Sequence, residues 1–258
     1  MSMPARAGMG AAWAPPPFEV REGSPALLTE IVRQKLDARA ASMPAPTGPF
    51  VIGVAGGVAV GKSTFAGELG EQVGGAQVIG TDGFLFPNTT LNALGLLSRK
   101  GFPESYDTSL AADLLHRIAE GQTDVAVPRY SHTTYDIDGP PQVVSQPNVL
   151  IVEGVNALQP PFAGYSSLRI YLDADEPDLR RWYADRFVSL VQQGEGFYAR
   201  WTGAPEDEVR SLATMTWEYV NLPNLTEHIL PTRWTADVVV RKGADHAVAA
   251  IAVRPQGG

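Results

Sequence analysis

The sequence contains no cysteine among its 258 residues. Disulfide bonds and zinc sites built on cysteine thiolates are therefore excluded, and a reducing, cytoplasmic location fits this composition. The chain also lacks any apolar run approaching the roughly 18 residues that a membrane-spanning helix needs. Its start, MSMPARAGMGAAWAPPPF, has one arginine but no sustained apolar core, so we expect a mobile tail there and no signal peptide.

Positive charge is scarce in this chain. Lysine and arginine total 20 against 28 aspartates and glutamates, which gives a net charge of −8 and a pI near 5.0. Such a chain has no general attraction for nucleic acid or for an anionic membrane, because both are polyanions. Any anion must be held by a local site, so we expect a small-molecule partner.

Short apolar runs alternate with helical patterns from residue 50 onward. Strands are expected at residues 50–56, 76–80, 148–154, 168–173, 236–242 and 247–253. Helices are expected at residues 62–73, 109–121 (capped by Ser109 or a near neighbour), 176–192 and 205–220. The alternation predicts an α/β protein with three layers, in which helices flank a mostly parallel central sheet. Residues 1–49 are expected to form an N-terminal tail with a short helix at 25–41, and residues 50–258 a single domain.

The Pro- and Tyr-rich stretch VPRYSHTTYDIDGPPQVV, residues 127–144, fits no helix. Its prolines, glycine and polar residues are typical of turns. We expect an irregular excursion or a hairpin beside the functional site.

The stretch GGVAVGKST, residues 56–64, matches the pattern G-x-x-x-x-G-K-S between an expected strand and an expected helix. This context indicates a P-loop, in which backbone N–H groups and a helix N-terminus cradle the phosphates of a nucleoside triphosphate. Lys62 should reach the β- and γ-phosphates, Ser63 should bind Mg²⁺, and Thr64 should donate to the α-phosphate. The expected nucleotide-binding residues are Gly56, Gly57, Val58, Ala59, Val60, Gly61, Lys62, Ser63 and Thr64.

Two carboxylates follow expected strands and should lie at the same edge of the sheet as the P-loop. Asp82 comes just after the strand in VIGTDGF, and Glu153 ends the strand in VLIVEG. Ligands of open α/β sheets collect beyond the carboxyl ends of the strands. One carboxylate can hold Mg²⁺ or its water, and the other can accept the proton of an acceptor hydroxyl. Spacing alone does not assign the two roles.

A transferring phosphoryl group needs a cation in addition to Lys62. The expected helix at 176–192 supplies Arg180, Arg181 and Arg186 in DLRRWYADRF. Arginines on a helix are more often solvated surface residues. Spacing by itself does not select one of the three.

Several stretches of the chain, in order from about Phe50 to Val253, resemble bacterial type I pantothenate kinases. They are GVAVGKST, TDGFLFPN, KGFPESYD, YSHTTYD, QPNVLIVEGVNALQ, WYADRF and NLPNLTEHILPTRWTADVVVRKGADHAV. The resemblance implies a P-loop kinase fold, shared with uridine kinase and phosphoribulokinase. It also implies transfer of the γ-phosphoryl group of ATP to the terminal hydroxyl of pantothenate, the first step towards coenzyme A, by a Mg²⁺-dependent homodimer.

The resemblance also implies roles for individual residues. Asp82 matches the catalytic base and Arg186 the arginine that stabilises the transition state, with Lys62 as the third catalytic group and Glu153 joining Ser63 at the metal. His246 matches a residue packed against adenine, and Lys100 a basic residue at the phosphates of coenzyme A. The residues that match contacts to pantothenate are Tyr130, His132, Tyr135, Tyr183 and Asn221.

The chain departs from the family pattern at three places. The segment before the P-loop is shorter, the loop 187–201 that covers the acceptor pocket is shorter, and Gly67 stands where a basic residue commonly contacts coenzyme A. These departures keep two alternatives open. One is a related kinase with another hydroxyl acceptor, such as a pantothenate analogue, a nucleoside or a sugar phosphate. The other is a nucleotide-binding sensor without catalysis.

Overall fold

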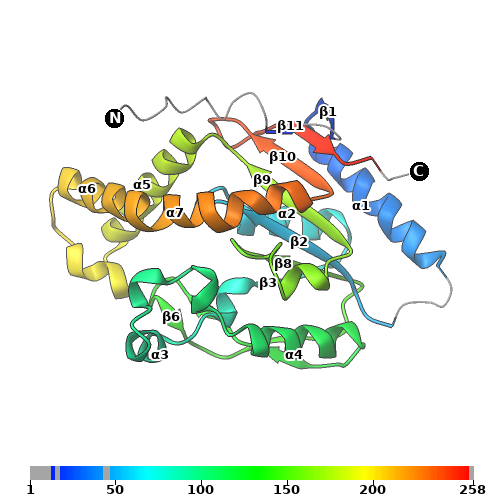
Figure 1. Ribbon diagram of the computed structural model, residues 1–258, viewed down its shortest axis with the longest axis horizontal. Coiled ribbons are helices and arrows are strands. Elements are labelled where there is room, and N and C mark those ends of the chain that lie inside the picture. The colour runs from blue at the N-terminus through cyan, green and yellow to red at the C-terminus, as the bar shows by residue number, and fades with distance from the viewer. Residues whose placement is uncertain (1–12, 15–17, 43–46, 256–258) are drawn as a thin grey trace, which may run out of the picture.

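A computed structural model of the protein describes residues 13–14, 18–42 and 47–255. Most of the expected mobile tail, residues 1–12 and 15–17, lies outside the described residues. Within the described part, strands form a seven-stranded sheet in the order β1-β11-β10-β9-β2-β8-β3 (Figure 1). The strands are β1 (Glu19–Glu22), β2 (Phe50–Gly56), β3 (Gln77–Gly80), β8 (Val149–Glu153), β9 (Leu168–Asp173), β10 (Val238–Lys242) and β11 (Val248–Val253).

The five strands from β10 to β3 are parallel, and β11 and β1 add to the β10 edge in antiparallel fashion. This arrangement confirms the expected α/β fold with a mostly parallel sheet. Strand β2 lies in the middle and is buried along its whole length, which fits its unbroken apolar sequence FVIGVAG.

Helices cover both faces of the sheet, so the molecule has three layers (Figure 1). Alternate residues of β2 enter different apolar cores: Val51 packs with α4, whereas Ile52 and Val54 pack with α1, α2 and α5. Asp107, rather than Ser109, caps α4 by accepting a hydrogen bond from the Leu110 N–H at 2.9 Å. The helices are α1 (Pro25–Ala40), α2 (Lys62–Gln72), α3 (Asn88–Ala93), α4 (Thr108–Ala119), α5 (Glu176–Gln193), α6 (Glu206–Thr216) and α7 (Leu222–Asn224).

The packed unit begins well before Phe50. Strand β1 pairs with β11 along Glu19–Glu22, and α1 buries Leu28, Ile31 and Val32 in the main core. The helix expected at residues 25–41 is therefore present, but it belongs to the same core as the sheet.

The last long helix contains two π-helical segments. Residues Trp217–Asn221 and Leu225–Ile229 are π-helical on either side of α7, so the helix that begins as α6 continues past the expected end at residue 220. The Trp217 Nε1–H donates to Glu176 Oε1 at 2.8 Å, at the start of α5. π-helical turns inside α-helices often occur at functional sites, and Asn221 lies in the first of them.

The excursion at residues 127–144 is a pair of nested hairpins, as expected. Strand β4 (Val125–Val127) pairs with β7 (Gln142–Val144), and β5 (Tyr130–Ser131) pairs with β6 (Asp136–Ile137). The inner hairpin carries Tyr130 on β5, and His132 and Tyr135 on the turn that connects β5 to β6.

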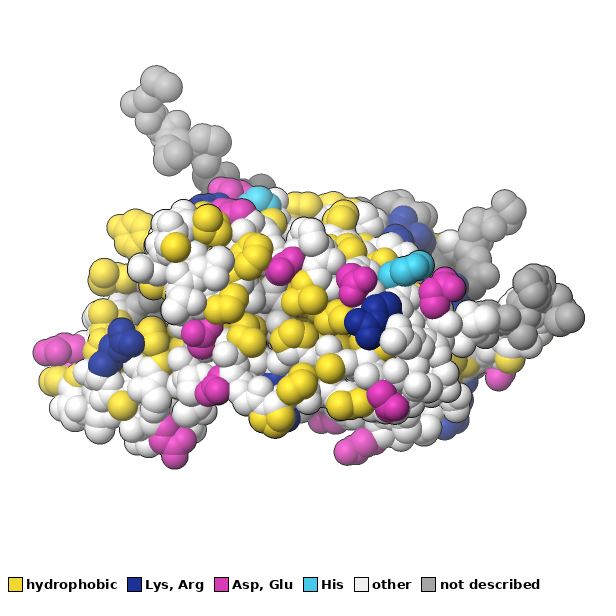
Figure 2. All heavy atoms as spheres, turned by 90° about the horizontal axis from the view of Figure 1, so that it is seen from below, with side chains coloured by type: hydrophobic (Ala, Val, Ile, Leu, Met, Phe, Trp, Pro, Cys, Tyr) yellow, Lys and Arg dark blue, Asp and Glu magenta, His cyan; other side chains and the backbone are white. Residues whose placement is uncertain are grey.

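The surface agrees with the low content of basic residues. On the face shown in Figure 2, basic side chains are few and are scattered among acidic and apolar ones. That face offers no continuous basic surface to a polyanion. No helix among the described residues combines the length and the apolar character needed to cross a membrane.

Candidate active site

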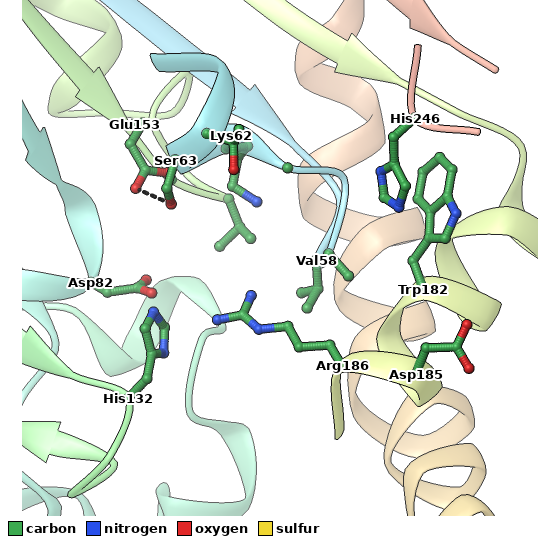
Figure 3. Close-up of a pocket in the computed structure, with 15 residues that line it drawn as sticks. Val58, Lys62, Ser63, Asp82, His132, Glu153, Trp182, Asp185, Arg186 and His246 are labelled. Atoms are coloured by element: carbon green, nitrogen blue, oxygen red, sulfur yellow. Dashed lines mark hydrogen bonds between the residues drawn. The ribbon is translucent and has the colours of Figure 1, made fainter. Parts of the chain in front are cut away.

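The carboxyl ends of three neighbouring parallel strands meet at one cavity of about 530 Å³. β2 leads into the P-loop, β8 ends in Glu153, and β3 is followed by a 3₁₀ turn (Thr81–Phe84) that carries Asp82. Helix α5 closes the opposite wall with Trp182 and Arg186 (Figure 3). The sheet order β2-β8-β3 thus brings the P-loop and both predicted carboxylates together, as the sequence indicates.

The P-loop turns sharply between β2 and α2. Gly61 caps α2 with a left-handed backbone (φ 88°), and Ala59 is also left-handed (φ 65°), a strained state for a residue with a side chain. The Lys62 Nζ donates to the carbonyl oxygens of Gly56 at 3.2 Å and Gly57 at 2.9 Å. Burial lowers the pKa of Lys62, and the negative charges of Glu153 and Asp82 oppose that shift.

Ser63 and Glu153 form the oxygen-rich side of the cavity. The Ser63 Oγ–H donates to Glu153 Oε1 at 2.8 Å (Figure 3). Burial raises the pKa of Glu153, while Lys62 and the Ser63 hydrogen bond lower it. No group of three or more His, Cys, Asp or Glu side chains in the described ranges is placed to hold a metal. A hydroxyl and one carboxylate suit Mg²⁺, which is usually completed by substrate phosphates and water.

Asp82 stands where two cavities meet. It lines the large cavity and an adjoining one of about 210 Å³, and His132 and Glu153 line both as well. The Tyr106 hydroxyl donates to Asp82 Oδ1 at 3.2 Å, and burial raises the pKa of Tyr106, so that the phenol stays a donor. A small acceptor can therefore bring a hydroxyl to this carboxylate beside the phosphate site.

The structure selects one of the three arginines that spacing left equal. Arg180 pairs with Glu218 at 2.8 Å and Arg181 with Asp178 at 2.9 Å, both on the surface. Among the described residues Arg186 has neither an ion pair nor a hydrogen bond, and its guanidinium points across the cavity towards Asp82 (Figure 3).

His132 faces Arg186 from the inner hairpin. Burial and the nearby Arg186 charge lower the pKa of His132, which favours a neutral imidazole. A neutral ring can exchange hydrogen bonds with an acceptor or a phosphate without adding charge.

An aromatic wall lies opposite the carboxylates. The rings of Trp182 and His246 stack with centroids 3.7 Å apart, and both line the large cavity (Figure 3). His246 has a left-handed backbone (φ 66°), which holds its ring in the turn between β10 and β11. The sequence pointed to His246 but not to Trp182, although Trp182 lies directly before Tyr183 in the same WYADRF motif.

The residues expected to contact the acceptor are only partly assembled at the cavities. His132 and Tyr130 line them, whereas Tyr135, Tyr183 and Asn221 do not line either. Burial raises the pKa of Tyr183 to about 12, and side-chain hydrogen bonds with Asn221 and Thr216 oppose that shift. Tyr183 and Asn221 therefore interact with each other in this structure, next to the cavities rather than in them.

Aromatic rings from three segments pack beside these residues. Phe197 stacks on Tyr135 with centroids 4.3 Å apart, and Phe187 contacts Tyr198 at 5.5 Å and Trp201 at 5.6 Å. We call Tyr135, Phe187, Phe197, Tyr198 and Trp201 the aromatic cluster. The family resemblance implied that the segment after Arg186 covers the acceptor pocket, but not that its rings pack against the hairpin.

Lys100 is buried beneath the same hairpin. Its Nζ donates to Asn88 Oδ1 and to the Tyr135 carbonyl oxygen, each at 2.6 Å, and lies 4.3 Å from the centroid of the Tyr135 ring. Burial lowers the pKa of Lys100 to about 8, against the opposing charge of Asp136. In this arrangement Lys100 supports the hairpin, and contact with a coenzyme A phosphate remains a prediction.

Comparison with known proteins agrees with this geometry. Residues 51–182 match the model of the Phosphoribulokinase / Uridine kinase family. A pantothenate kinase of Sorangium cellulosum is 44% identical over 224 residues, covering 80% of this chain and 73% of the relative. The chain belongs to the pantothenate kinase family. A pantothenate kinase of Cutibacterium acnes is 41% identical over 228 residues, covering 80% of this chain and 70% of the relative.

Solved structures of other kinases share the fold of this pantothenate kinase family member. A candidate fructose transport system kinase from Silicibacter sp. TM1040 has a TM-score of 0.64 at 23% identity and covers 83% of this chain and 95% of its own. D-glycerate 3-kinase from Cryptococcus neoformans has a TM-score of 0.58 at 13% identity and covers 89% and 99%. At such identities these structures establish the P-loop kinase fold alone.

Proposed function

We propose that this protein transfers the γ-phosphoryl group of ATP to the terminal hydroxyl of pantothenate and releases ADP and 4′-phosphopantothenate. The observation that carries the proposal is one cavity that holds a P-loop, two carboxylates and the unpaired Arg186, in a chain of the pantothenate kinase family. Catalysis of phosphoryl transfer is chiefly positioning and charge stabilisation, and these groups supply both.

The nucleotide side is assigned as follows. The base rests on the Trp182–His246 stack, and the backbone N–H groups of residues 56–64 hold the phosphates. When the nucleotide binds, the Lys62 ammonium leaves the carbonyl oxygens of Gly56 and Gly57 and donates to phosphate oxygens instead. Ser63 and Glu153 hold Mg²⁺, which would neutralise charge on the β- and γ-phosphates.

The transfer step is assigned to Asp82 and Arg186. Asp82 accepts the proton of the pantothenate hydroxyl as its oxygen bonds to the γ-phosphorus, and the bond to the bridging oxygen breaks to release ADP. The Arg186 guanidinium stabilises negative charge on the transferring group. The acceptor is positioned by Tyr130, His132, Tyr135, Tyr183 and Asn221.

ADP release measured with pantothenate and with a panel of other alcohols tests the substrate. The panel contains a pantothenate analogue, a nucleoside and a sugar phosphate. We expect kcat/KM to be highest for pantothenate. A much higher kcat/KM for another alcohol would show that the protein is a kinase with a different acceptor. If no alcohol causes ADP release, the protein would instead be a nucleotide-binding sensor without catalysis.

We further propose that the protein works in the cytoplasm as a homodimer. The absence of cysteine supports the first part and the membership of the family supports the second. Sedimentation equilibrium of the full chain at micromolar concentration tests the dimer, and a monomer mass would contradict it.

A further inference from the structure

The chain has only four lysines, and one of them, Lys242, has no assigned task. Lys242 ends β10, where the pairing with β11 shifts register between Arg241 and Lys242. The preceding Arg241 is fixed by Asp173 at 2.5 Å and Asp175 at 2.6 Å. Lys242 is partly buried, and its ammonium has no hydrogen bond or ion pair with any residue that the structure describes.

The ammonium of Lys242 lies against the P-loop. A Cβ built on Gly61 would be 3.4 Å from Lys242 Nζ, and apart from its two chain neighbours no other described residue would come within 4 Å of it. Gly61 is the N-cap of α2 and lines the large cavity, as does His246, four residues after Lys242. Burial and, after it, the Lys242 charge lower the pKa of His246.

The N-terminus of α2 collects positive charge that no acidic residue in its first turn offsets. The N-terminus of a helix carries a partial positive charge, and acidic side chains normally accompany it. Helix α2 has no acidic residue in its first turn, whereas α5 has Glu176 and Asp178 there. Lys62 and Lys242 instead bring two ammonium groups to this end. Burial lowers the pKa of Lys242, and the charge of Glu68 opposes that shift.

We propose that Lys242 binds a phosphate oxygen of the nucleotide on the side of the P-loop that faces the Trp182–His246 stack. In a nucleotide whose base rests on that stack and whose β- and γ-phosphates lie at Lys62, this group is the α-phosphate. The inference rests on the proposed function, because it takes a nucleoside triphosphate as the ligand of the cavity. It adds a second lysine, from the end of β10, to the phosphate contacts that the P-loop provides.

The role predicts a specific kinetic pattern. The α-phosphate keeps its charge during transfer of the γ-phosphoryl group, so Lys242 stabilises the bound nucleotide equally in the ground state and the transition state. Such uniform binding lowers the KM for ATP and leaves kcat unchanged. ADP retains the α-phosphate and should depend on Lys242 as strongly as ATP does.

The test measures ADP binding to the full chain by calorimetry with Mg²⁺ and without any acceptor. We expect Lys242→Met to weaken ADP binding by about 10- to 100-fold, the range of a charge-assisted hydrogen bond. Lys242→Arg should remain within a few-fold of the unmodified protein. The ATP KM of Lys242→Met should rise by the same factor as the ADP dissociation constant, at constant kcat. Lys35→Met, on α1 away from the cavity, is the matched control and should change nothing.

Two results would overturn the role of Lys242. One is ADP affinity of Lys242→Met equal to that of the unmodified protein. The other is a loss of affinity accompanied by a lower melting temperature of the nucleotide-free protein, since removing an unpaired cation beside a helix N-terminus should not destabilise the fold. Because no acceptor is present, a wrong assignment of pantothenate does not affect either result. Failure of the unmodified protein to bind ADP would instead reject the kinase proposal.

Discussion

The phosphate side and the acceptor side of the site are built in different ways. On the phosphate side, Lys62, Asp82 and Glu153 project from backbone at the ends of buried parallel strands into an open cavity. On the acceptor side, the rings of the aromatic cluster pack against one another, with Phe197 stacked on Tyr135. The first half is preorganised by the sheet, whereas the second depends on side chains of a hairpin, a helix and a loop. We therefore assign charge stabilisation to the phosphate side and acceptor choice to the acceptor side.

The loop of the acceptor side is held closely against the hairpin. Gly196 has a left-handed backbone (φ 53°), and a Cβ at that position would lie 1.9 Å from the Thr133 carbonyl oxygen. The Phe197 N–H donates to the same oxygen at 2.8 Å. Only glycine fits this approach, so substitutions there should disturb the acceptor side and leave the phosphate side intact.

The largest effects on turnover should come from substitutions on the phosphate side. We expect Lys62→Ala or Asp82→Ala to lower kcat by at least about 100-fold, because the first removes a phosphate clamp and the second the general base. Steady-state ADP release at saturating ATP and pantothenate measures the effect. Tyr106→Phe is the control for Asp82, since it removes only a hydrogen bond to the carboxylate. Near-normal turnover of either alanine variant would reject the mechanism.

Arg186 connects the halves, because it extends from α5 towards Asp82. Arg186→Ala should lower kcat by roughly 100-fold and change the KM for ATP little, as expected for a group that acts on the transition state. Arg180→Ala, on the same helix but paired with Glu218 on the surface, should be close to normal. A rise in the ATP KM without a fall in kcat would make Arg186 a ground-state ligand.

Asn221 should affect the acceptor side alone. Asn221 is one of the residues that we propose to position the acceptor, so Asn221→Ala should raise the KM for pantothenate by about tenfold, the worth of one hydrogen bond. The ADP dissociation constant should not change. If ADP binding weakens as much as pantothenate binding, the two halves are not separable at this residue.

Substitution of Gly67 should have a smaller effect, which concerns inhibition by coenzyme A. Because this position lacks the basic residue of the family pattern, we expect coenzyme A to inhibit weakly. A Cβ at Gly67 would meet no atom within 4 Å, so Gly67→Arg should fold normally and strengthen inhibition by about tenfold through a charge-assisted contact. Gly67→Gln serves as the uncharged control. Strong ATP-competitive inhibition of the unmodified protein at micromolar coenzyme A would contradict the prediction.

Lys100 should alter stability rather than turnover. Its pKa of about 8 in the folded protein lies below the ordinary value of about 10.4, so the unfolded chain binds the extra proton between these pH values. The free energy of unfolding contributed by this group should therefore rise with pH across that window, by about 1–2 kcal/mol. Urea unfolding of the unmodified protein and of Lys100→Met at pH 7.5 and 10 measures the difference. A difference that stays constant with pH would show that Lys100 titrates normally.

Much of the phosphate side could be predicted from sequence because its signals are local. The P-loop, Asp82 and Glu153 each follow a recognisable apolar strand, and parallel strands bring such positions to one edge. Strand β1 gave no signal: its sequence, EVRE, is exposed along its whole length and is held by pairing with β11. An edge strand of this kind carries no apolar alternation to detect.

By itself, the sequence determined the α/β alternation, the P-loop and the positions of the two carboxylates at strand ends, because each depends on a pattern of a few neighbouring residues. Residue spacing did not distinguish Arg186 from Arg180 and Arg181, and the tertiary structure did so by pairing only the latter two on the surface. Only the tertiary structure stacked Trp182 on His246 and placed Lys242 against Gly61. These decisions depend on how α5 and the β10–β11 turn pack around the sheet. Packing brings together residues that lie far apart in the chain, and no local pattern records such contacts.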